Sequence, residues 1–149
     1  MGRLNKASCA NCPSNRFITF FFCVLDPVTG DVVFANAGHN PPIVVRASGE
    51  MQLLEGGGPV LGILPIAPYR EERAHLDPGD MLVLYSDGVT EATNSVNDEY
   101  GEDRFIRVLR ERRNDPASAI VQASMQSVNE FAAGAPQADD ITLVVAKRT

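Results

Sequence analysis

The sequence lacks several features that would place it in common classes of protein. It has no surplus of positive charge, because 13 Lys and Arg residues stand against 19 Asp and Glu residues and give a net charge of -6. A nucleic-acid surface needs a basic face, so nucleic acid is not an expected partner. No run approaches about 18 apolar residues, the length of a membrane span, and residues 1–5 lack the apolar stretch of a secretory signal. We therefore expect no membrane partner and a cytoplasmic location.

Cysteine is also scarce. Cys9, Cys12 and Cys23 are too few for a disulfide scaffold and suit a reducing compartment. Cys9 and Cys12 form a C-x-x-C pair, but a zinc site needs two further ligands, and His39 and His75 lie far along the chain. The pair also precedes the first expected strand, whereas a redox C-x-x-C pair normally lies at the start of a helix that follows a strand. We favour two thiols in an irregular leader over a functional pair.

The remaining composition is that of one domain with a real core: 149 residues, of which 44% are apolar and 21% charged. Residues 1–16 are polar and are expected to be a leader or the remnant of an upstream helix, while residues 17–149 form the domain. Residues 17–25 are almost continuously β-branched or aromatic, which predicts a central strand buried on both faces. The other predicted strands are 32–36, 43–46, 51–54, 69–76, 81–85 and, within 139–147, the closing run.

Turn chemistry at 26–31 and 77–80 predicts hairpins, and the glycine-rich segment 55–65 predicts an extended loop. Apolar residues at helical spacing predict helices over 102–113 and 116–132, the second with Asp115 as N-cap. Many antiparallel strands, two helices and a last strand indicate an α+β fold, with the helices segregated on a sheet or sandwich.

Three segments could carry chemistry. Asp87-Gly88 directly follows the buried strand 81–85, where a carboxylate can converge on a ligand, although Asp-Gly is also a common turn. Asp139 and Asp140 open the closing strand, and alternation would send their side chains to opposite faces, so that one of them joins Asp87. Two such carboxylates suit a hard cation, Mg²⁺ or Mn²⁺; the alternative is an acidic loop.

The third segment is residues 36–42 (NAGHNPP). His39 stands beside Gly and Pro in this segment, where it could be a ligand, a base or a donor to phosphate. The other interpretation is that its hydrogen bonds merely fix the loop.

Together, these motifs resemble the metal-dependent serine/threonine protein phosphatases, specifically the bacterial SpoIIE/RsbU-type branch of the PPM family. The matching segments are 16–26 (RFITFFFCVLD), 36–42 (NAGHNPP), 57–62 (GGPVLG), 79–91 (GDMLVLYSDGVTE), 100–105 (YGEDRF) and 138–144 (ADDITLV). The resemblance implies a β-sandwich flanked by helices, in which two Mn²⁺ or Mg²⁺ ions activate a water for attack on phosphoserine or phosphothreonine.

The resemblance also implies roles for individual residues. Asp87 matches a metal ligand of the family, and Gly88 is its companion in the motif. Asp139 is the better match to the second ligand, with Asp140 the fallback. His39 falls where many eukaryotic relatives carry an aspartate tied to a third, weaker metal. The implied substrate is a regulatory phosphoprotein of a bacterial partner-switching or stress/sporulation pathway, such as an anti-sigma-factor antagonist.

The sequence departs from the family pattern at one point. The pattern begins with a Gly-Asp-aromatic-aromatic-Asp segment whose aspartate bridges the two metals, and this sequence has none: Gly30-Asp31 and Gly79-Asp80 lie in expected turns. We therefore expect a domain missing its first strands, either excised or naturally truncated, with little activity alone and a tendency to form a homodimer. The alternatives are a catalytically dead module that binds a phosphoprotein or an anti-sigma regulator, and a structural sandwich with no site.

Overall fold

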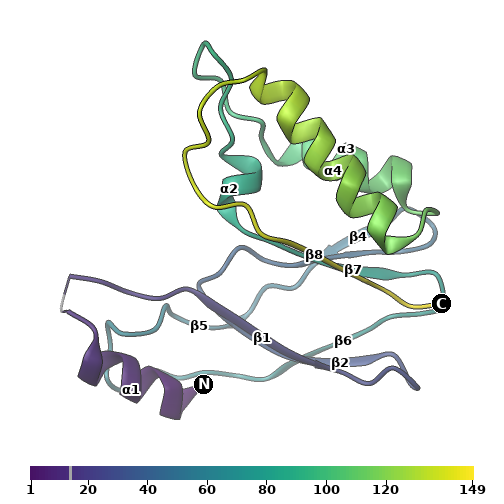
Figure 1. Cartoon of the computed structure of the whole chain (residues 1–149). Helices are drawn as coiled ribbons and strands as arrows, with labels where there is room; N and C mark the ends of the chain where they lie inside the picture. Colours follow the sequence, from purple (N-terminus) through teal and green to yellow (C-terminus); the bar gives the residue numbers. More distant parts are fainter. Residues whose placement is uncertain (14) are drawn as a thin grey trace. The chain divides into compact units, whose positions relative to one another are not determined.

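The chain folds into two units (Figure 1). A computed structural model describes residues 1–13 and 15–149; Ser14, in the expected leader, lies outside the described residues. The first unit comprises Met1–Pro41 and Leu54–His75, and the second unit comprises Pro42–Leu53 and Leu76–Thr149. Each unit contains one four-stranded sheet, and all but one of the strand pairings are antiparallel. The predicted α+β class is therefore confirmed.

The sheet of the first unit is built around a central strand, β2. This strand pairs antiparallel with β1 and β6 and, over two residues, parallel with β5. The elements of the unit are α1 (Gly2–Asn11), β1 (Phe20–Leu25), β2 (Asp31–Ala37), β5 (Gly57–Gly58) and β6 (Glu72–His75). The predicted hairpin between β1 and β2 is confirmed: the Asp26 carboxylate accepts hydrogen bonds from the backbone N–H groups of Val28 and Thr29, at 2.8 and 3.1 Å.

The prediction for the first apolar run is wrong in one respect. Strand β1 is an edge strand, because within the described part of the chain it pairs with β2 alone. Phe22 and Val24 point away from the packed face and are 53% and 57% exposed, while Phe21 stacks on Phe34 with ring centroids 5.7 Å apart. An apolar run shows that a strand can be buried on both faces, but the neighbouring strands and layers decide whether it is.

The segment expected to be a leader or the remnant of an upstream helix contains the helix α1. Its Asn5 is 1% exposed and makes two hydrogen bonds to the loop after β5: the side-chain amide donates to the Leu64 carbonyl at 2.8 Å, and Oδ1 accepts from the Gly62 N–H at 3.0 Å. Cys9 and Cys12 at the end of α1 are free thiols. The helix is thus anchored to the first unit through a buried polar side chain.

The second unit contains a sheet in the order β4-β3-β7-β8 and three helices. Figure 1 shows α3 and α4 over one face of this sheet. Its elements are β3 (Ile43–Val45), β4 (Met51–Leu53), β7 (Met81–Tyr85), α2 (Asp87–Thr90), α3 (Glu102–Arg112), α4 (Ala117–Ala132) and β8 (Leu143–Lys147). The core between sheet and helices consists of Ile43, Val45, Met81, Val83, Tyr85, Val89, Tyr100, Phe105, Leu109, Ile120 and Val128.

Strand β7 is buried on both faces, as predicted, since Leu82 on the face opposite the core is only 1% exposed. The predicted helices are confirmed, but Asp115 is not the N-cap of α4. Pro116 takes that position with extended backbone angles, and the Asp115 carbonyl instead accepts a hydrogen bond from Lys147 Nζ at 2.9 Å. Among the described residues, no helix has the length and hydrophobicity needed to cross a membrane.

Candidate functional site

The Asp87 motif lies at the end of β7, an almost completely buried strand of the second unit. Strand β7 ends at Tyr85, whose ring packs against Phe105 with centroids 5.0 Å apart and whose hydroxyl donates to Glu102 at 2.7 Å. The chain then enters the single-turn helix α2, which begins at Asp87 and which the sequence did not predict. The buried strand therefore fixes the backbone on which the exposed Asp87 carboxylate is carried.

Ser86 joins this motif to the acidic segment before β8. Its N–H donates to the Thr142 carbonyl at 3.0 Å, and its hydroxyl donates to the Asp140 carbonyl and accepts from the Thr142 N–H, both at 2.9 Å. The two acidic motifs, which are distant in the sequence, are therefore adjacent at the level of the backbone. We call residues Ser86, Asp87, Gly88, Asp139 and Asp140 the acidic junction.

Gly88 makes this close approach possible. It is buried, and a Cβ atom at this position would lie 2.5 Å from the Asp140 carbonyl oxygen and 3.3 Å from the Asp139 carbonyl oxygen. Any side chain here would push the 139–140 segment away from α2. The glycine of the Asp-Gly motif thus has a packing role, which is independent of any ligand.

The structure corrects the expected placement of Asp139 and Asp140. Both residues are exposed and lie in the loop before β8, which begins only at Leu143. The Asp140 carbonyl is bonded to the Ser86 hydroxyl instead of to a neighbouring strand, and the Asp139 carboxylate accepts from the Asp140 N–H at 2.7 Å. Because neither residue is in a strand, strand alternation cannot decide which carboxylate joins Asp87.

The carboxylates of the acidic junction can supply some of the ligands of one hard cation. Carboxylates and water are the ligands that Mg²⁺ prefers, and one or two carboxylates with water completing the octahedron are common. Over residues 1–13 and 15–149, however, no group of three or more His, Cys, Asp and Glu side chains is arranged to hold a metal ion. The residues present therefore fit a single ion with few protein ligands better than a closed two-ion site.

His39 lies in the first unit, where hydrogen bonds fix its loop. The Asn36 side chain accepts from the His39 N–H at 2.8 Å and donates to the His39 carbonyl at 2.9 Å, and the imidazole Nδ1 lies 3.3 Å from the Thr19 hydroxyl. Gly38 has a positive φ of 71°, and a side chain there would collide with Val60. These contacts support the loop-fixing interpretation of His39 and leave the ring partly exposed.

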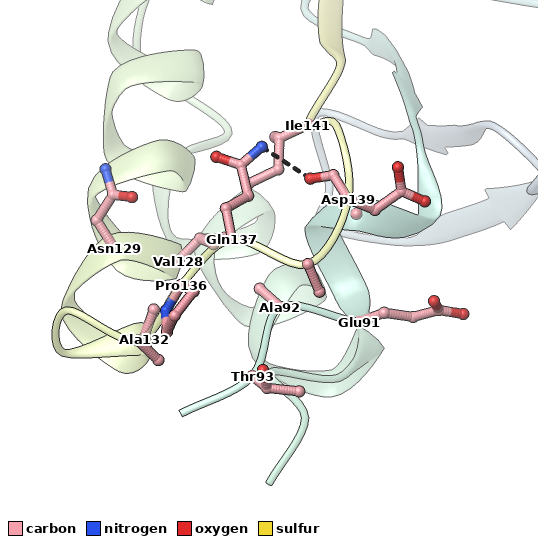
Figure 2. A pocket seen from close by; sticks show the side chains of 13 residues that line it. Glu91, Ala92, Thr93, Val128, Asn129, Ala132, Pro136, Gln137, Asp139 and Ile141 are labelled. Atoms are coloured by element: carbon pink, nitrogen blue, oxygen red, sulfur yellow. Dashed lines mark hydrogen bonds between the residues drawn. The ribbon is translucent and has the colours of Figure 1, made fainter. Parts of the chain in front are cut away.

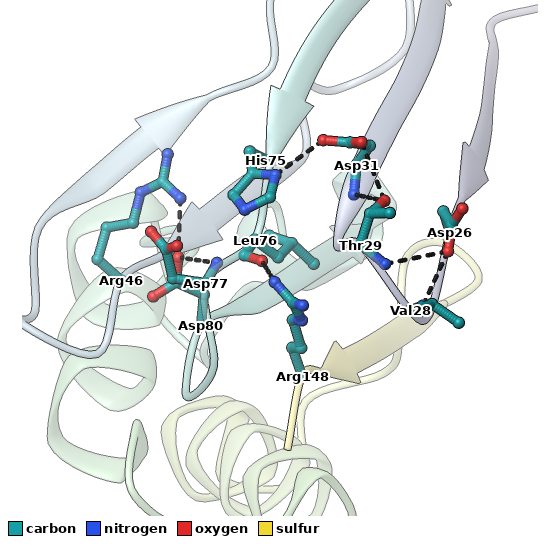
Figure 3. Close-up of polar contacts among 10 residues, drawn as sticks. All are labelled: Asp26, Val28, Thr29, Asp31, Arg46, His75, Leu76, Asp77, Asp80 and Arg148. Carbon is teal, nitrogen blue, oxygen red and sulfur yellow. Dashed lines mark hydrogen bonds and ion pairs between the residues drawn. The ribbon is translucent and has the colours of Figure 1, made fainter.

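The aspartates of the two Gly-Asp pairs, Asp31 and Asp80, make hydrogen bonds and ion pairs within the fold (Figure 3). Asp80 is 2% exposed, and its carboxylate accepts from Arg46 at 2.8 Å and from the N–H groups of Ala47 and Asp77 at 2.9 and 3.0 Å. Burial raises the pKa of the Asp80 carboxyl, but these hydrogen bonds and the Arg46 charge outweigh burial and lower the pKa overall. Asp31 is exposed and pairs with His75 at 2.8 Å.

Sequence reasoning missed a cavity of about 210 Å³ beside the acidic junction (Figure 2). Gly88 and Asp139 line it together with the segment after α2, the end of α4 and the loop before β8. The available signal was the run of small residues near the end of α4, which leaves space unfilled. We call this space the α4 cavity; its other lining residues include Glu91, Ala92, Thr93, Ala132, Ala135 and Gln137.

Comparisons with known proteins agree with the resemblance of the motifs. The sequence model of the family described as Stage II sporulation protein E (SpoIIE) matches residues 1–149. The chain is 31% identical over 132 residues to Protein IcfG of Synechocystis, and 30% identical over 149 residues to Phosphoserine phosphatase RsbU of Bacillus subtilis. These alignments cover 89% and 97% of the chain, but only 21% and 43% of the relatives' own lengths.

Solved structures show the same fold. The SiaA-PP2C domain of Pseudomonas aeruginosa superposes with a TM-score of 0.79 at 23% identity, covering 95% of this chain and 57% of that one. The phosphatase domain of SpoIIE from Bacillus subtilis, in a form described as Mn presoaked, gives a TM-score of 0.67 at 17% identity and covers 97% of this chain and 71% of that one.

Proposed function

This chain belongs to the SpoIIE family, and we propose that it contributes to a metal-dependent phosphatase that removes phosphate from phosphoserine or phosphothreonine in a regulatory phosphoprotein. The observation that carries this proposal is the acidic junction, where three hydrogen bonds of Ser86 and the missing side chain of Gly88 hold the two acidic motifs together. The name of the relative RsbU, a phosphoserine phosphatase, supports the same chemistry.

The metal-binding residues in this proposal are Asp87 and Asp139, with Asp140 as the fallback and Gly88 as their close neighbour. Their carboxylates give the acidic junction negative charge, and water would fill most of the coordination positions of a bound ion. When bound, Mn²⁺ or Mg²⁺ supplies an acidified water and neutralises charge on the phosphoryl oxygens. Two ions are expected from the family resemblance, and the Mn presoak described for the SpoIIE structure supports manganese.

The proposed partner is a phosphoprotein of a bacterial signalling pathway in the cytoplasm, such as an anti-sigma-factor antagonist. A second candidate function is a phosphatase-like module that binds a phosphoprotein or an anti-sigma regulator without turnover. One observation favours it: the described residues hold no cluster of three metal-ligating side chains. Two-metal catalysis places the ions about 3.5–4 Å apart, and a bridging carboxylate is expected to set that distance. We therefore expect the 149-residue chain to hydrolyse p-nitrophenyl phosphate slowly or not at all.

Metal titration tests the proposal. Mn²⁺ should bind weakly to the wild type in calorimetry, and Asp87→Ala and Asp139→Ala should each weaken this binding clearly, because each removes a charged ligand. Asp140→Asn should leave binding nearly intact and Asp139→Asn should weaken it, because Asp139 is the better match to the ligand in the family motif. Asp103→Ala is the control, since it removes an exposed carboxylate from α3, in the same unit.

Two outcomes would count against this assignment. Unchanged Mn²⁺ binding in both Asp87→Ala and Asp139→Ala would remove the acidic junction as the metal site. A larger loss in Asp140→Asn than in Asp139→Asn would move the second ligand by one residue. Robust Mn²⁺-dependent hydrolysis that Asp87→Ala abolishes would instead favour the enzyme over the binding module.

A further inference from the structure

The α4 cavity is large enough for one side chain and smaller than pockets that enclose drug-sized ligands. Its volume is about 210 Å³, whereas pockets that enclose drug-sized ligands measure about 300–1,000 Å³. Gly88 and Asp139, two members of the acidic junction, form part of its lining. Successive Cα atoms in a peptide are about 3.8 Å apart. A residue close in sequence to a phosphoserine held at the junction can therefore place its side chain in the cavity.

The charges around the cavity exclude phosphate itself. Glu91 and Asp139 are its only charged lining residues, and both are acidic; all the lining residues belong to the described part of the chain. In Figure 2 the carboxylates of both residues point away from the α4 wall. Acidic groups at the rim repel a phosphate or an acidic side chain, and they tolerate a neutral one.

Apolar groups form part of the cavity lining, beside the polar side chains of Thr93, Asn129 and Gln137, and several alanines leave the space unfilled. Val128 and Ala132 of α4, Ala92 after α2, and Ile141 contribute apolar surface. Two hydrogen bonds hold opposite sides in place: Gln137 Nε2 donates to the Asp139 carbonyl at 2.7 Å, and the Tyr100 N–H donates to the Ala92 carbonyl at 2.8 Å. The cavity is therefore formed before any ligand binds, and filling it costs little rearrangement.

We propose that the α4 cavity is a specificity subsite, which accepts one neutral aliphatic side chain flanking the phosphorylated residue of a protein substrate or partner. This inference rests on the proposed function, because it requires the phosphoserine to be held at the acidic junction. It adds a preference that the metal site alone does not supply: the bound segment carries an apolar residue such as leucine beside its phosphoserine, and no acidic residue at that position.

Phosphopeptide binding tests the subsite directly. The probes are heptapeptides with a central phosphoserine and with Leu, Ala or Glu at one or two positions on either side, titrated into the Mn²⁺-loaded chain by fluorescence anisotropy. At one of these positions Leu should bind roughly tenfold more tightly than Ala, as expected for burying an aliphatic side chain. Glu should bind more weakly than Ala there.

Variants that fill the cavity should remove this preference. Ala132→Leu, on α4, and Ala135→Leu, in the following loop, should each reduce the Leu-to-Ala ratio to about one, without changing Mn²⁺ affinity. Ala123→Leu is the matched control, because it makes the same substitution on α4 at a residue that does not line the cavity. Thermal unfolding of all three variants checks that they fold. If Ala132→Leu does not fold, Ala135→Leu still tests the subsite.

The outcomes separate the subsite from the proposed function. Mn²⁺ binding that depends on Asp87 and Asp139, together with equal affinities for the Leu, Ala and Glu peptides, would overturn the subsite alone. So would the absence of any phosphopeptide binding, or a leucine preference that survives in both cavity variants. Mn²⁺ binding that is independent of Asp87 and Asp139 would overturn the proposed function as well.

Discussion

Strands β1 and β7 have similarly apolar sequences, FFFCVL and MLVLY, but very different surroundings. Strand β7, in the second unit, lies between β3 and β8 and is almost completely buried. Strand β1, in the first unit, has β2 as its one partner among the described residues, and Phe22 and Val24 are more than half exposed. Apolar composition therefore makes a run of residues able to be buried, while its position in the sheet determines the stability that burial supplies.

The largest expected difference is between the loss of a buried phenylalanine in the second unit and the loss of a half-exposed one in the first unit. Phe105 is 0% exposed and packs against Tyr85 in the core of the second unit, so Phe105→Ala should lower the free energy of unfolding by about 3–5 kcal/mol. Phe22→Ala in β1 removes a half-exposed ring and should cost less than about 1 kcal/mol. Urea denaturation followed by circular dichroism measures both. Equal losses would show that the exposed face of β1 is covered in solution.

A second pair of substitutions compares buried and exposed aspartates. Asp80→Ala in the second unit removes the carboxylate that pairs with Arg46 and accepts from two backbone N–H groups, while Arg46 keeps its hydrogen bond to Gln52. The loss should be about 3 kcal/mol, the lower end for breaking a buried ion pair, because the Arg46 side chain is partly exposed. Asp31→Ala in the first unit removes an exposed pair with His75 and should change stability little.

The pH dependence of stability should differ in the same way. The pKa of Asp80 is lowered in the folded state, so its contribution is fully present above the ordinary aspartate pKa of about 3.9 and is lost as the pH falls below it. Wild type should therefore lose more stability than Asp80→Asn between pH 5 and the acid limit of folding, roughly pH 3. An identical acid profile for the two proteins would contradict the importance of the Asp80 network.

Local patterns were sufficient to predict most strands and both long helices, because hydrophobic periodicity and turn residues act over a few positions. They could not place β1 at an edge, since that depends on which strands lie beside it. They also missed the single turn of α2 and the loop position of Asp139 and Asp140. These depend on the Ser86 hydroxyl, which bonds to a segment far away in the sequence. The α4 cavity was missed for a related reason, because side chains from several elements define it together.

The exposed edge of the first unit should recruit a second copy of the chain. Strand β1 is six residues long, contains no charged residue or proline, and presents Phe22 and Val24 to solvent. Edges of this kind pair with other strands. We expect dimers at tens of micromolar (roughly the range of weak association) in sedimentation, and Val24→Lys should shift the chain to monomer. Val96→Lys, at an exposed valine of the second unit, is the control. Monomer alone in the wild type would contradict the prediction.

The smallest expected effect concerns one hydroxyl group in the second unit. Tyr85 donates a hydrogen bond to Glu102 at 2.7 Å, which connects β7 to α3, and Tyr85→Phe should cost about 1 kcal/mol because the packed ring stays. Burial, followed by the hydrogen bond to Glu102 and its negative charge, raises the pKa of Tyr85 above its ordinary value. The folded state then keeps a proton that the unfolded state releases, so this contribution is fully present below about pH 10 and is lost as the pH rises further. Denaturation at pH 8 and pH 11 should show a larger alkaline loss for wild type than for Tyr85→Phe. Equal losses would mean that Tyr85 ionises as freely in the folded second unit as in the unfolded chain. Its hydroxyl would then not contribute to the stability of the buried strand β7.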